Sequence, residues 1–292
     1  MSKVIIGSRG SDLALWQAHH VKKQLEDLNH EVEIKIIVTQ GDAIQHLSFD
    51  KLEGKGFFTK EIEVELLAKS IDLAVHSHKD LETNPPAGLV IAAVSERENP
   101  ADLLLIRKSS VDKSEKWGLK KNGVIGTSSA RRKSLVKALR PDCTTEDLRG
   151  NVPTRIGKLA DEQYDAIILA KAGVDRLKLD LSEFHVHVMD TSEFVPAPAQ
   201  GVLGLQIREG DERMAEILKH LNNKEVLNRI RIERKVLNLM EGGCQLPLGV
   251  FCDIDGKIHV SHAKTANEAA KITHFEHNGA FDIAEKIVAT LK

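Results

Sequence analysis

The stretch Val124-Ile125-Gly126-Thr127-Ser128-Ser129-Ala130-Arg131-Arg132 shows the pattern on which the whole chain is built. Its first four residues have the apolar character of a buried strand, and the two serines begin a helix that we expect to reach Leu139. A strand that leads directly into a helix is the repeating unit of α/β proteins. Two arginines occupy the first helical turn, where the helix dipole disfavours cations, so we expect an anion to lie between them.

The same alternation continues on both sides of this stretch. Before it, we expect strands at 3–7, 31–39, 72–77 and 89–94, and helices at 12–28 and 59–69. After the strand at 103–106 and the quoted unit, we expect a strand that ends at 148–151 and a helix capped by Asn151. Further strands are expected at 166–169, 184–189 and 202–208, and further helices at 211–221 and 224–240. Two strands joined by the hairpin signal Asp255-Gly256, a third strand at 270–277 and a helix at 281–291 complete the chain. We expect His185 and His187 on the solvated face of an edge strand.

The predicted fold class is α/β, with two hinged lobes that resemble solute-binding proteins and a small C-terminal α+β domain. Residues 1–98 and 201–221 form the discontinuous first lobe, residues 102–197 the second lobe, and residues 222–292 the C-terminal domain. The chain leaves the first lobe near 97–102 and returns through the proline-rich segment 194–201. Two crossings between the lobes predict a hinge.

Composition narrows the class of protein. Hydrophobic residues make up 41% and charged residues 29%, as in soluble globular proteins. No apolar run approaches the roughly 20 residues of a membrane span, and a strand so soon after Met1 predicts that there is no signal peptide. The three cysteines are widely spread and lack a CxxC pair, which favours a reducing cytoplasm and argues against a disulfide framework or a structural zinc site.

Positive charge is concentrated in one part of the chain, although the net charge is only −2. The basic residues there are Arg131, Arg132, Lys133, Lys137, Arg140, Arg149, Arg155 and Lys158. Nucleic acid is one conceivable partner, but aromatic residues make up only 4% and no nucleic-acid motif is present. A small ligand rich in carboxylates fits better, because arginine pairs with carboxylates in a bidentate manner. The alternative is that these arginines are solvated surface residues.

The first lobe offers one carboxylate and two histidines near a strand end. Asp80 follows the strand at 72–77 and stands beside Lys79, and the loop Ser8-Arg9-Gly10-Ser11 follows the first strand. Ligands of open α/β sheets bind at the carboxyl ends of strands, so we expect both segments to line a cleft. His76 and His78 are expected on one strand face and could hold a metal, but no third ligand is evident and we expect none.

The loop Gly242-Gly243-Cys244-Gln245-Leu246-Pro247-Leu248-Gly249 presents a single cysteine. Paired glycines free the backbone before it, and Pro247 and Gly249 prevent a helix after it. A thiolate on such a loop can act as a nucleophile or a covalent anchor. The alternative is a buried cysteine that acts as a small hydrophobic residue. A second long connection, residues 40–56, has the length of a lid or of a segment without structure.

These segments together resemble the porphobilinogen deaminase (hydroxymethylbilane synthase) family over essentially the whole chain. The matching segments are Ser8-Arg9-Gly10-Ser11 with Leu13-Ala14-Leu15-Trp16-Gln17-Ala18, Val75-His76-Ser77-His78-Lys79-Asp80, Gly126-Thr127-Ser128-Ser129-Ala130-Arg131-Arg132, Leu148-Arg149-Gly150-Asn151-Val152-Pro153-Thr154-Arg155 and Glu241-Gly242-Gly243-Cys244-Gln245. Three positions depart from the family pattern. His78 stands where an apolar residue is usual, Glu82 where proline is usual, and Ala199 where glycine usually precedes Gln200.

The resemblance implies a transferase of tetrapyrrole and heme biosynthesis. It implies a dipyrromethane cofactor joined to Cys244 by a thioether, to which four porphobilinogen units are added with release of ammonia before hydroxymethylbilane is released. Asp80 is the implied catalytic residue, since a carboxylate can relay protons at pyrrole nitrogen and stabilise the cation left by ammonia. The other implied cofactor-binding residues are Lys79, Thr127, Ser129, Arg131, Arg132 and Gly150. The implied substrate-binding residues are Arg9, Ser11, Arg149, Arg155, Arg176 and Gln200.

Two other classes of protein remain open at this point. A two-lobed solute-binding or ligand-sensing protein would need neither Asp80 nor Cys244, and a metal-dependent enzyme would use His76 and His78. The expected partners are porphobilinogen and the growing oligopyrrole, with no nucleic acid and no membrane, and we expect a cytoplasmic monomer.

Overall fold

The computed structural model describes residues 3–39, 59–241, 243, 245–277 and 282–291. Contacts divide the chain into two compact units, each of which is assembled from separate parts of the sequence. Unit 1 comprises Met1–Glu98 and Gly201–Asn228, and unit 2 comprises Asn99–Gln200 and Arg229–Lys292. The boundary at 228 falls inside a helix, and the predicted division into three domains stays a prediction.

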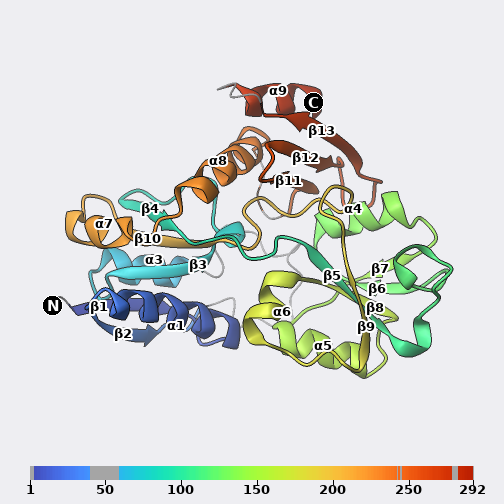
Figure 1. Cartoon of the computed structure of the whole chain (residues 1–292), viewed down its shortest axis with the longest axis horizontal. Coiled ribbons are helices and arrows are strands. Elements are labelled where there is room, and N and C mark those ends of the chain that lie inside the picture. The colour runs from blue at the N-terminus through green and yellow to red at the C-terminus, as the bar shows by residue number, and fades with distance from the viewer. Residues whose placement is uncertain (1–2, 40–58, 242, 244, 278–281, 292) are drawn as a thin grey trace. The chain divides into compact units, whose positions relative to one another are not determined.

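Unit 1 contains a five-stranded sheet in the order β2-β1-β3-β10-β4 (Figure 1). Its strands are β1 (Lys3–Ser8), β2 (Glu31–Ile36), β3 (Leu73–Ser77), β4 (Leu89–Val94) and β10 (Leu203–Arg208). β1 pairs parallel with β2 and β3, whereas β10 pairs antiparallel with β3 and β4. The return of the chain to the first sheet through β10 is therefore confirmed.

Helices cover both faces of this sheet because each has an apolar stripe. α1 (Asp12–Asp27) and α7 (Glu212–Lys219) pack on one face through residues such as Val21, Leu25 and Met214. α3 (Lys60–Leu67) packs on the other face through Ile62 and Leu66. The short 3₁₀ helix η2 (His78–Asp80) follows β3 directly. Since β1 and β3 are parallel neighbours, the loops that follow them share one edge of the sheet.

Unit 2 contains a second five-stranded sheet, in the order β7-β6-β8-β5-β9. Its strands are β5 (Asp102–Arg107), β6 (Val124–Gly126), β7 (Thr144–Glu146), β8 (Ala166–Ala170) and β9 (Phe184–Val188). β6 is parallel to β7 and β8, and β5 is antiparallel to β8 and β9. The helices are α4 (Ala130–Leu139), α5 (Val152–Ala160) and α6 (Lys171–Leu177), with the 3₁₀ turns η3 (Lys108–Ser110) and η4 (Lys116–Gly118). α4 packs against one apolar cluster, and α5 and α6 against another.

The C-terminal part of unit 2 is a three-stranded antiparallel sheet with its own core. It consists of β11 (Leu248–Cys252), β12 (Lys257–His262) and β13 (Lys271–Glu276), with α8 (Lys224–Leu239) and α9 (Ile283–Leu291). Gly256 has a φ of +83° in the hairpin between β11 and β12, a conformation that favours glycine. The predicted α/β class and the small α+β part are thus confirmed. Among the helices that the structure describes, none has both the length and the apolar character to cross a membrane.

Two local expectations were wrong. β9 is an edge strand as expected, but Val186 and Val188, 39% and 48% exposed, form its open face. His185 and His187 lie on the more covered face, because the turn at Gly118 approaches His185 Nε2. The strand that precedes Arg149 ends earlier than expected, at Glu146, and Leu148 is a buried loop residue.

Candidate active site

The first group of predicted site residues lies in unit 1, at the carboxyl ends of β1 and β3. Arg9 and Ser11 are half-buried in the loop between β1 and α1, and the Ser11 side chain makes no cap hydrogen bond to α1. Gln17 of α1 donates from Nε2 to Ser77 Oγ at 2.8 Å. This hydrogen bond ties the start of α1 to the end of β3, so the Arg9 loop and η2 are held along one edge.

η2 presents Asp80 to solvent while it buries His78. Asp80 is exposed, Lys79 is half-buried, and His78 is only 5% exposed. The backbone N–H of His78 donates to Val202 O at 2.9 Å. Gly204 leaves room for the imidazole, because a Cβ there would lie 3.3 Å from His78 Cδ2. The unusual histidine is therefore accommodated in the interior, and the carboxylate beside it stays accessible.

β3 ends between His76 and His78, so the second histidine lies in η2 and not on the strand. His76 lies in β3, and its Nε2 lies 2.9 Å from Oε1 of Gln206. Gln206 donates in turn from Nε2 to Glu63 Oε1 at 3.1 Å. Burial lowers the pKa of His76 from 6.5 to about 4, although the bond to Gln206 acts in the other direction. Within the described ranges, no three His, Cys, Asp or Glu side chains are grouped so that they could hold a metal ion.

The second group lies in unit 2, around the first turn of α4. Arg131 and Arg132 are 5% and 6% exposed, and both bind the fully buried carboxylate of Asp102. Arg131 Nη1 donates to Oδ2 at 2.9 Å, and Arg132 Nη2 donates to Oδ1 at 2.7 Å. Burial would raise the pKa of Asp102, but the two guanidinium groups outweigh it and hold that pKa well below its usual range. The anion expected between the arginines is thus part of the protein.

The segment before α4 supplies hydroxyl groups and free backbone donors. Thr127 is buried, and its Oγ1 accepts a hydrogen bond from the Ser129 backbone N–H at 3.3 Å. Ser129 is the N-cap residue of α4, but its side chain makes no cap hydrogen bond. The N–H groups of the first turn therefore lack a capping side chain, and such a helix start favours an anion.

Gln200 is buried and bound to the same carboxylate. Its Nε2 donates to Asp102 Oδ1 at 2.9 Å and to Pro100 O at 2.7 Å. Ala199, which replaces the usual glycine, has a φ of +60°, and its N–H donates to Glu233 Oε2 at 2.7 Å. Both amide hydrogens of Gln200 are committed within unit 2, and a contact between Gln200 and substrate stays a prediction.

Arg149, Gly150 and Arg155 surround the start of α5. Asn151 caps this helix by accepting from the Thr154 N–H at 2.9 Å. Gly150 has a φ of +112°, and a Cβ there would lie 2.7 Å from Thr154 Cγ2, so only glycine fits. Arg155 Nε donates to Gly150 O at 2.7 Å, and both arginines are half-buried. Arg176 lies at the end of α6 and is buried.

The predicted cofactor anchor, Cys244, lies outside the described residues, as does the connection at 40–56. The other two cysteines, Cys143 and Cys252, are buried and form no disulfide. Burial raises the pKa of Cys143 to about 11, with Arg140 acting in the other direction. Neither buried thiol is suited to covalent attachment of a ligand.

Sequence reasoning missed Asp102 and one cavity. Asp102 is an acid at the start of the apolar strand β5. Because a buried acid in such a strand needs charged or hydrogen-bonding partners, its place in the sequence was the signal that could have identified it.

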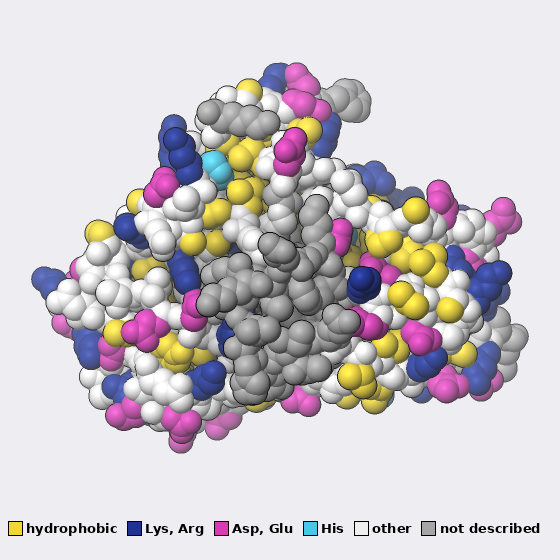
Figure 2. Space-filling model, turned by 180° about the vertical axis from the view of Figure 1, so that it is seen from behind, with side chains coloured by type: hydrophobic (Ala, Val, Ile, Leu, Met, Phe, Trp, Pro, Cys, Tyr) yellow, Lys and Arg dark blue, Asp and Glu magenta, His cyan; other side chains and the backbone are white. Residues whose placement is uncertain are grey.

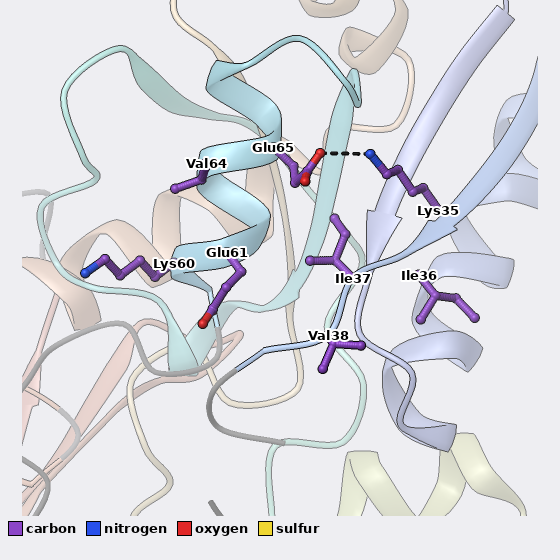
Figure 3. Close-up of a pocket in the computed structure, with 8 residues that line it drawn as sticks. All are labelled: Lys35, Ile36, Ile37, Val38, Lys60, Glu61, Val64 and Glu65. Carbon is purple, nitrogen blue, oxygen red and sulfur yellow. Dashed lines mark hydrogen bonds and ion pairs between the residues drawn. The ribbon is translucent and has the colours of Figure 1, made fainter. Parts of the chain in front are cut away.

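The cavity, of about 470 Å³, lies in unit 1 between the end of β2 and α3 (Figure 3). Its lining residues are Lys35, Ile36, Ile37, Val38, Lys60, Glu61, Val64 and Glu65. Basic and acidic side chains are interspersed on the face shown in Figure 2. Three of the arginines predicted as site residues, Arg131, Arg132 and Arg176, are buried.

Comparison with known proteins identifies the family. Residues 4–216 match a family model described as porphobilinogen deaminase, dipyrromethane cofactor binding domain. The chain belongs to the porphobilinogen deaminase family. A porphobilinogen deaminase of Sulfurimonas denitrificans is 44% identical over 89% of this chain and 83% of its own length. One from Campylobacter jejuni subsp. doylei is 43% identical over 87% of this chain and 81% of its own length. Among solved structures, an ancestral cationic amino acid solute-binding protein has a TM-score of 0.44 and 14% identity, with 82% of this chain and 93% of that chain covered.

The donors around α4 fit the cofactor of this family. Dipyrromethane carries carboxylate side chains, and the uncapped N–H groups of α4 are suited to such an anion. Arg131 uses only Nη1 in hydrogen bonds among the described residues, so Nε and Nη2 remain for a ligand. Arg132 Nε is buried without a hydrogen-bond partner in the same part of the chain. A carboxylate-rich group can therefore bind this helix start.

Proposed function

We propose that the chain is the transferase that joins four porphobilinogen units to a covalent dipyrromethane and releases hydroxymethylbilane. Family membership over residues 4–216 carries this proposal. When bound, dipyrromethane supplies the pyrrole end to which the units are joined. The work of this chain is to hold carboxylates, to move protons and to stabilise the positive charge that develops as ammonia leaves.

The arginines and hydroxyls of unit 2 are proposed to hold carboxylate side chains. Arg131 offers the Nε and Nη2 edge of its guanidinium, the geometry that a carboxylate can accept with both oxygens. Besides Arg131, the proposed cofactor contacts are Lys79, Thr127, Ser129, Arg132 and Gly150. The proposed substrate contacts are Arg9, Ser11, Arg149, Arg155, Arg176 and Gln200.

Asp80 is proposed to do the proton chemistry. It is exposed at the end of η2, so its carboxylate can approach a pyrrole nitrogen. There it accepts and returns a proton, and its negative charge stabilises the cation formed on loss of ammonia. Burial of His78 and the hydrogen bond from Gln17 to Ser77 support the segment that carries it.

Cys244 is proposed as the thioether anchor of the cofactor. The burial of Cys143 and Cys252 supports this choice, since a covalent anchor must be reached by its ligand. We further propose a cytoplasmic monomer that binds no nucleic acid. Neither Cys143 nor Cys252 forms a disulfide, which is consistent with a reducing compartment.

Mass spectrometry of the denatured protein tests the proposal. Protein expressed with porphobilinogen available should be heavier than its sequence by the two-ring cofactor, and brief exposure to porphobilinogen should add up to four equal increments. Cys244→Ala should remove the adduct and the ladder, whereas the matched control Cys252→Ala should keep both. A wild-type protein that has its sequence mass and gives no ladder would show instead a protein that at most binds its ligand without a covalent bond.

A further inference from the structure

Side chains hold residues 147–150, the loop between β7 and α5, one carbonyl at a time. The hydrogen bonds between β6 and β7 end with the bond from the Thr127 N–H to Glu146 O at 2.7 Å. Beyond it, every backbone carbonyl of the loop accepts from a side-chain donor. These bonds run from Tyr164 Oη to Asp147 O at 2.7 Å, from Ser128 Oγ to Leu148 O at 3.0 Å, from Lys158 Nζ to Arg149 O at 3.2 Å and from Arg155 Nε to Gly150 O at 2.7 Å.

Ser128 binds both backbone groups of Leu148. Its Oγ donates to Leu148 O and accepts from the Leu148 N–H, each at 3.0 Å. Leu148 has no exposed surface, so its backbone groups cannot exchange this partner for water. The serine side chain therefore continues the pairing of the two segments where the β6–β7 ladder ends.

Tyr164 holds the preceding residue of the loop. Its ring lies against Gly126, where a Cβ would be 2.9 Å from Tyr164 Cδ1, so the absence of a side chain at 126 lets the ring approach the end of β6. Burial raises the pKa of Tyr164, and Glu146 and Asp147 act in the same direction. The hydroxyl group thus keeps the proton that it donates to Asp147 O.

These bonds decide which way the backbone donors of the loop point. In a trans peptide, the carbonyl and the N–H that follows it point in opposite directions. Carbonyls that are held by the protein therefore turn the next N–H groups away from their side-chain donors. Within the described part of the chain, the N–H groups of Gly150 and Asn151 make no hydrogen bond, and both residues are exposed. Such outward N–H groups are suited to an anion.

We propose that Ser128 and Tyr164 are positioning residues, which hold the 147–150 loop in the conformation in which Arg149 and the Gly150 N–H bind ligand carboxylates. This inference rests on the proposed function, in which Arg149 is a substrate contact. The loop would bind a carboxylate side chain and not the reacting atoms, so its contacts are as strong in the ground state as in the transition state. Loss of either hydroxyl should therefore raise KM and leave kcat nearly unchanged.

Two substitutions that each remove one oxygen atom test this role. Tyr164→Phe keeps the ring and loses the bond to Asp147 O, and Ser128→Ala loses both bonds to Leu148. We expect KM for porphobilinogen to rise about fivefold in Tyr164→Phe and about tenfold in Ser128→Ala, with kcat within about twofold of wild type. The matched control is Ser110→Ala, which breaks the bond from another buried serine of unit 2 to Asp165 at 2.7 Å and should leave KM unchanged.

The constants are measured on gel-filtered protein and scaled to the fraction that carries the covalent adduct in the mass spectrum, with the melting temperature measured alongside. A merely structural role would lower the melting temperature and the amount of active protein but would not raise KM. An unchanged KM in Tyr164→Phe, or a fall in kcat at constant KM, would overturn the proposal, and this variant decides even if Ser128→Ala does not fold. Wild-type protein that carries no adduct and consumes no porphobilinogen would instead refute the proposed function.

Discussion

Replacement of His76 by glutamine should flatten the acid side of the stability profile of unit 1. His76 is buried in β3, and Gln206 Nε2 is occupied by Glu63. The Gln206 oxygen therefore accepts from His76, which fixes the neutral imidazole with its proton on Nε2. In His76→Gln, the amide Nε2 can donate to the same oxygen, but the side chain no longer titrates.

The size of the effect follows from the two pKa values of His76. The folded state keeps His76 neutral down to about pH 4, whereas the unfolded chain takes up a proton below pH 6.5. The unfolded state thus binds more protons between these values, and the stability due to the neutral imidazole is lost as the pH falls through this window. The loss is about 2 kcal/mol by pH 5 and about 3 kcal/mol by pH 4.

The carboxyl groups of Glu63 and Asp102, whose pKa values are also shifted, do not produce the same signature. Burial raises the pKa of Glu63, so the folded state binds its proton more readily than the unfolded chain does. Its contribution to the free energy of unfolding therefore increases as the pH falls, opposite to that of His76. Asp102 has a lowered pKa, and its contribution is lost only below the ordinary aspartate range of about 4. The difference between wild type and His76→Gln therefore isolates the histidine.

Urea unfolding at pH 7.5, 6 and 5 measures this difference. Trp16 lies in unit 1, so its fluorescence reports that unit in a Trp117→Phe background used for both proteins. Wild type should lose about 2 kcal/mol more than His76→Gln between pH 7.5 and pH 5. Parallel pH profiles for the two proteins would refute the assignment of a buried neutral histidine.

Two further predictions concern turnover. Asp80→Ala should keep the covalent cofactor in the mass spectrum but lower porphobilinogen consumption by about 10²–10⁴-fold. Near-normal consumption would show that Asp80 is not the residue that transfers the proton at the pyrrole nitrogen. Arg149→Leu and Arg155→Leu, whose side chains are half-buried at the start of α5, should lower porphobilinogen turnover far more than melting temperature. A large drop in melting temperature with intact turnover would make these arginines structural.

The order of strands and helices could be predicted because each element carries its own local signal. Ser129 precedes α4, Asn151 caps α5 and Asp211 caps α7, and the structure has helices that begin at the next residue in each case. The strand at 203–208 pairs with strands more than a hundred residues earlier. Its return to the first lobe was predicted from the proline-rich crossing at 194–201 that precedes it, since periodicity alone does not specify a strand's partner.

The partner of the arginines could not be predicted, because it is distant in sequence. A pair of arginines in the first turn of α4 signals an anion, but nothing local distinguishes a ligand carboxylate from Asp102, which precedes them by 29 and 30 positions. The prediction that His185 and His187 of β9 face solvent was wrong for a similar reason. Alternation shows that 185 and 187 share a face, whereas the turn at Gly118 decides which face is covered.

The two carboxylates at strand ends are suited to different tasks. Asp102 is fully buried, and both of its oxygens accept from Arg131, Arg132 or Gln200. A carboxylate that is held ionised by two arginines can orient them but is a poor proton acceptor, because protonation would leave both cations without their anion. Asp80 is exposed on a short turn and can approach a substrate atom. Burial and pairing thus suit Asp102 to charge balance, and exposure is consistent with the proton transfer that we propose for Asp80. The sequence does not show this difference, because both residues simply stand next to strands.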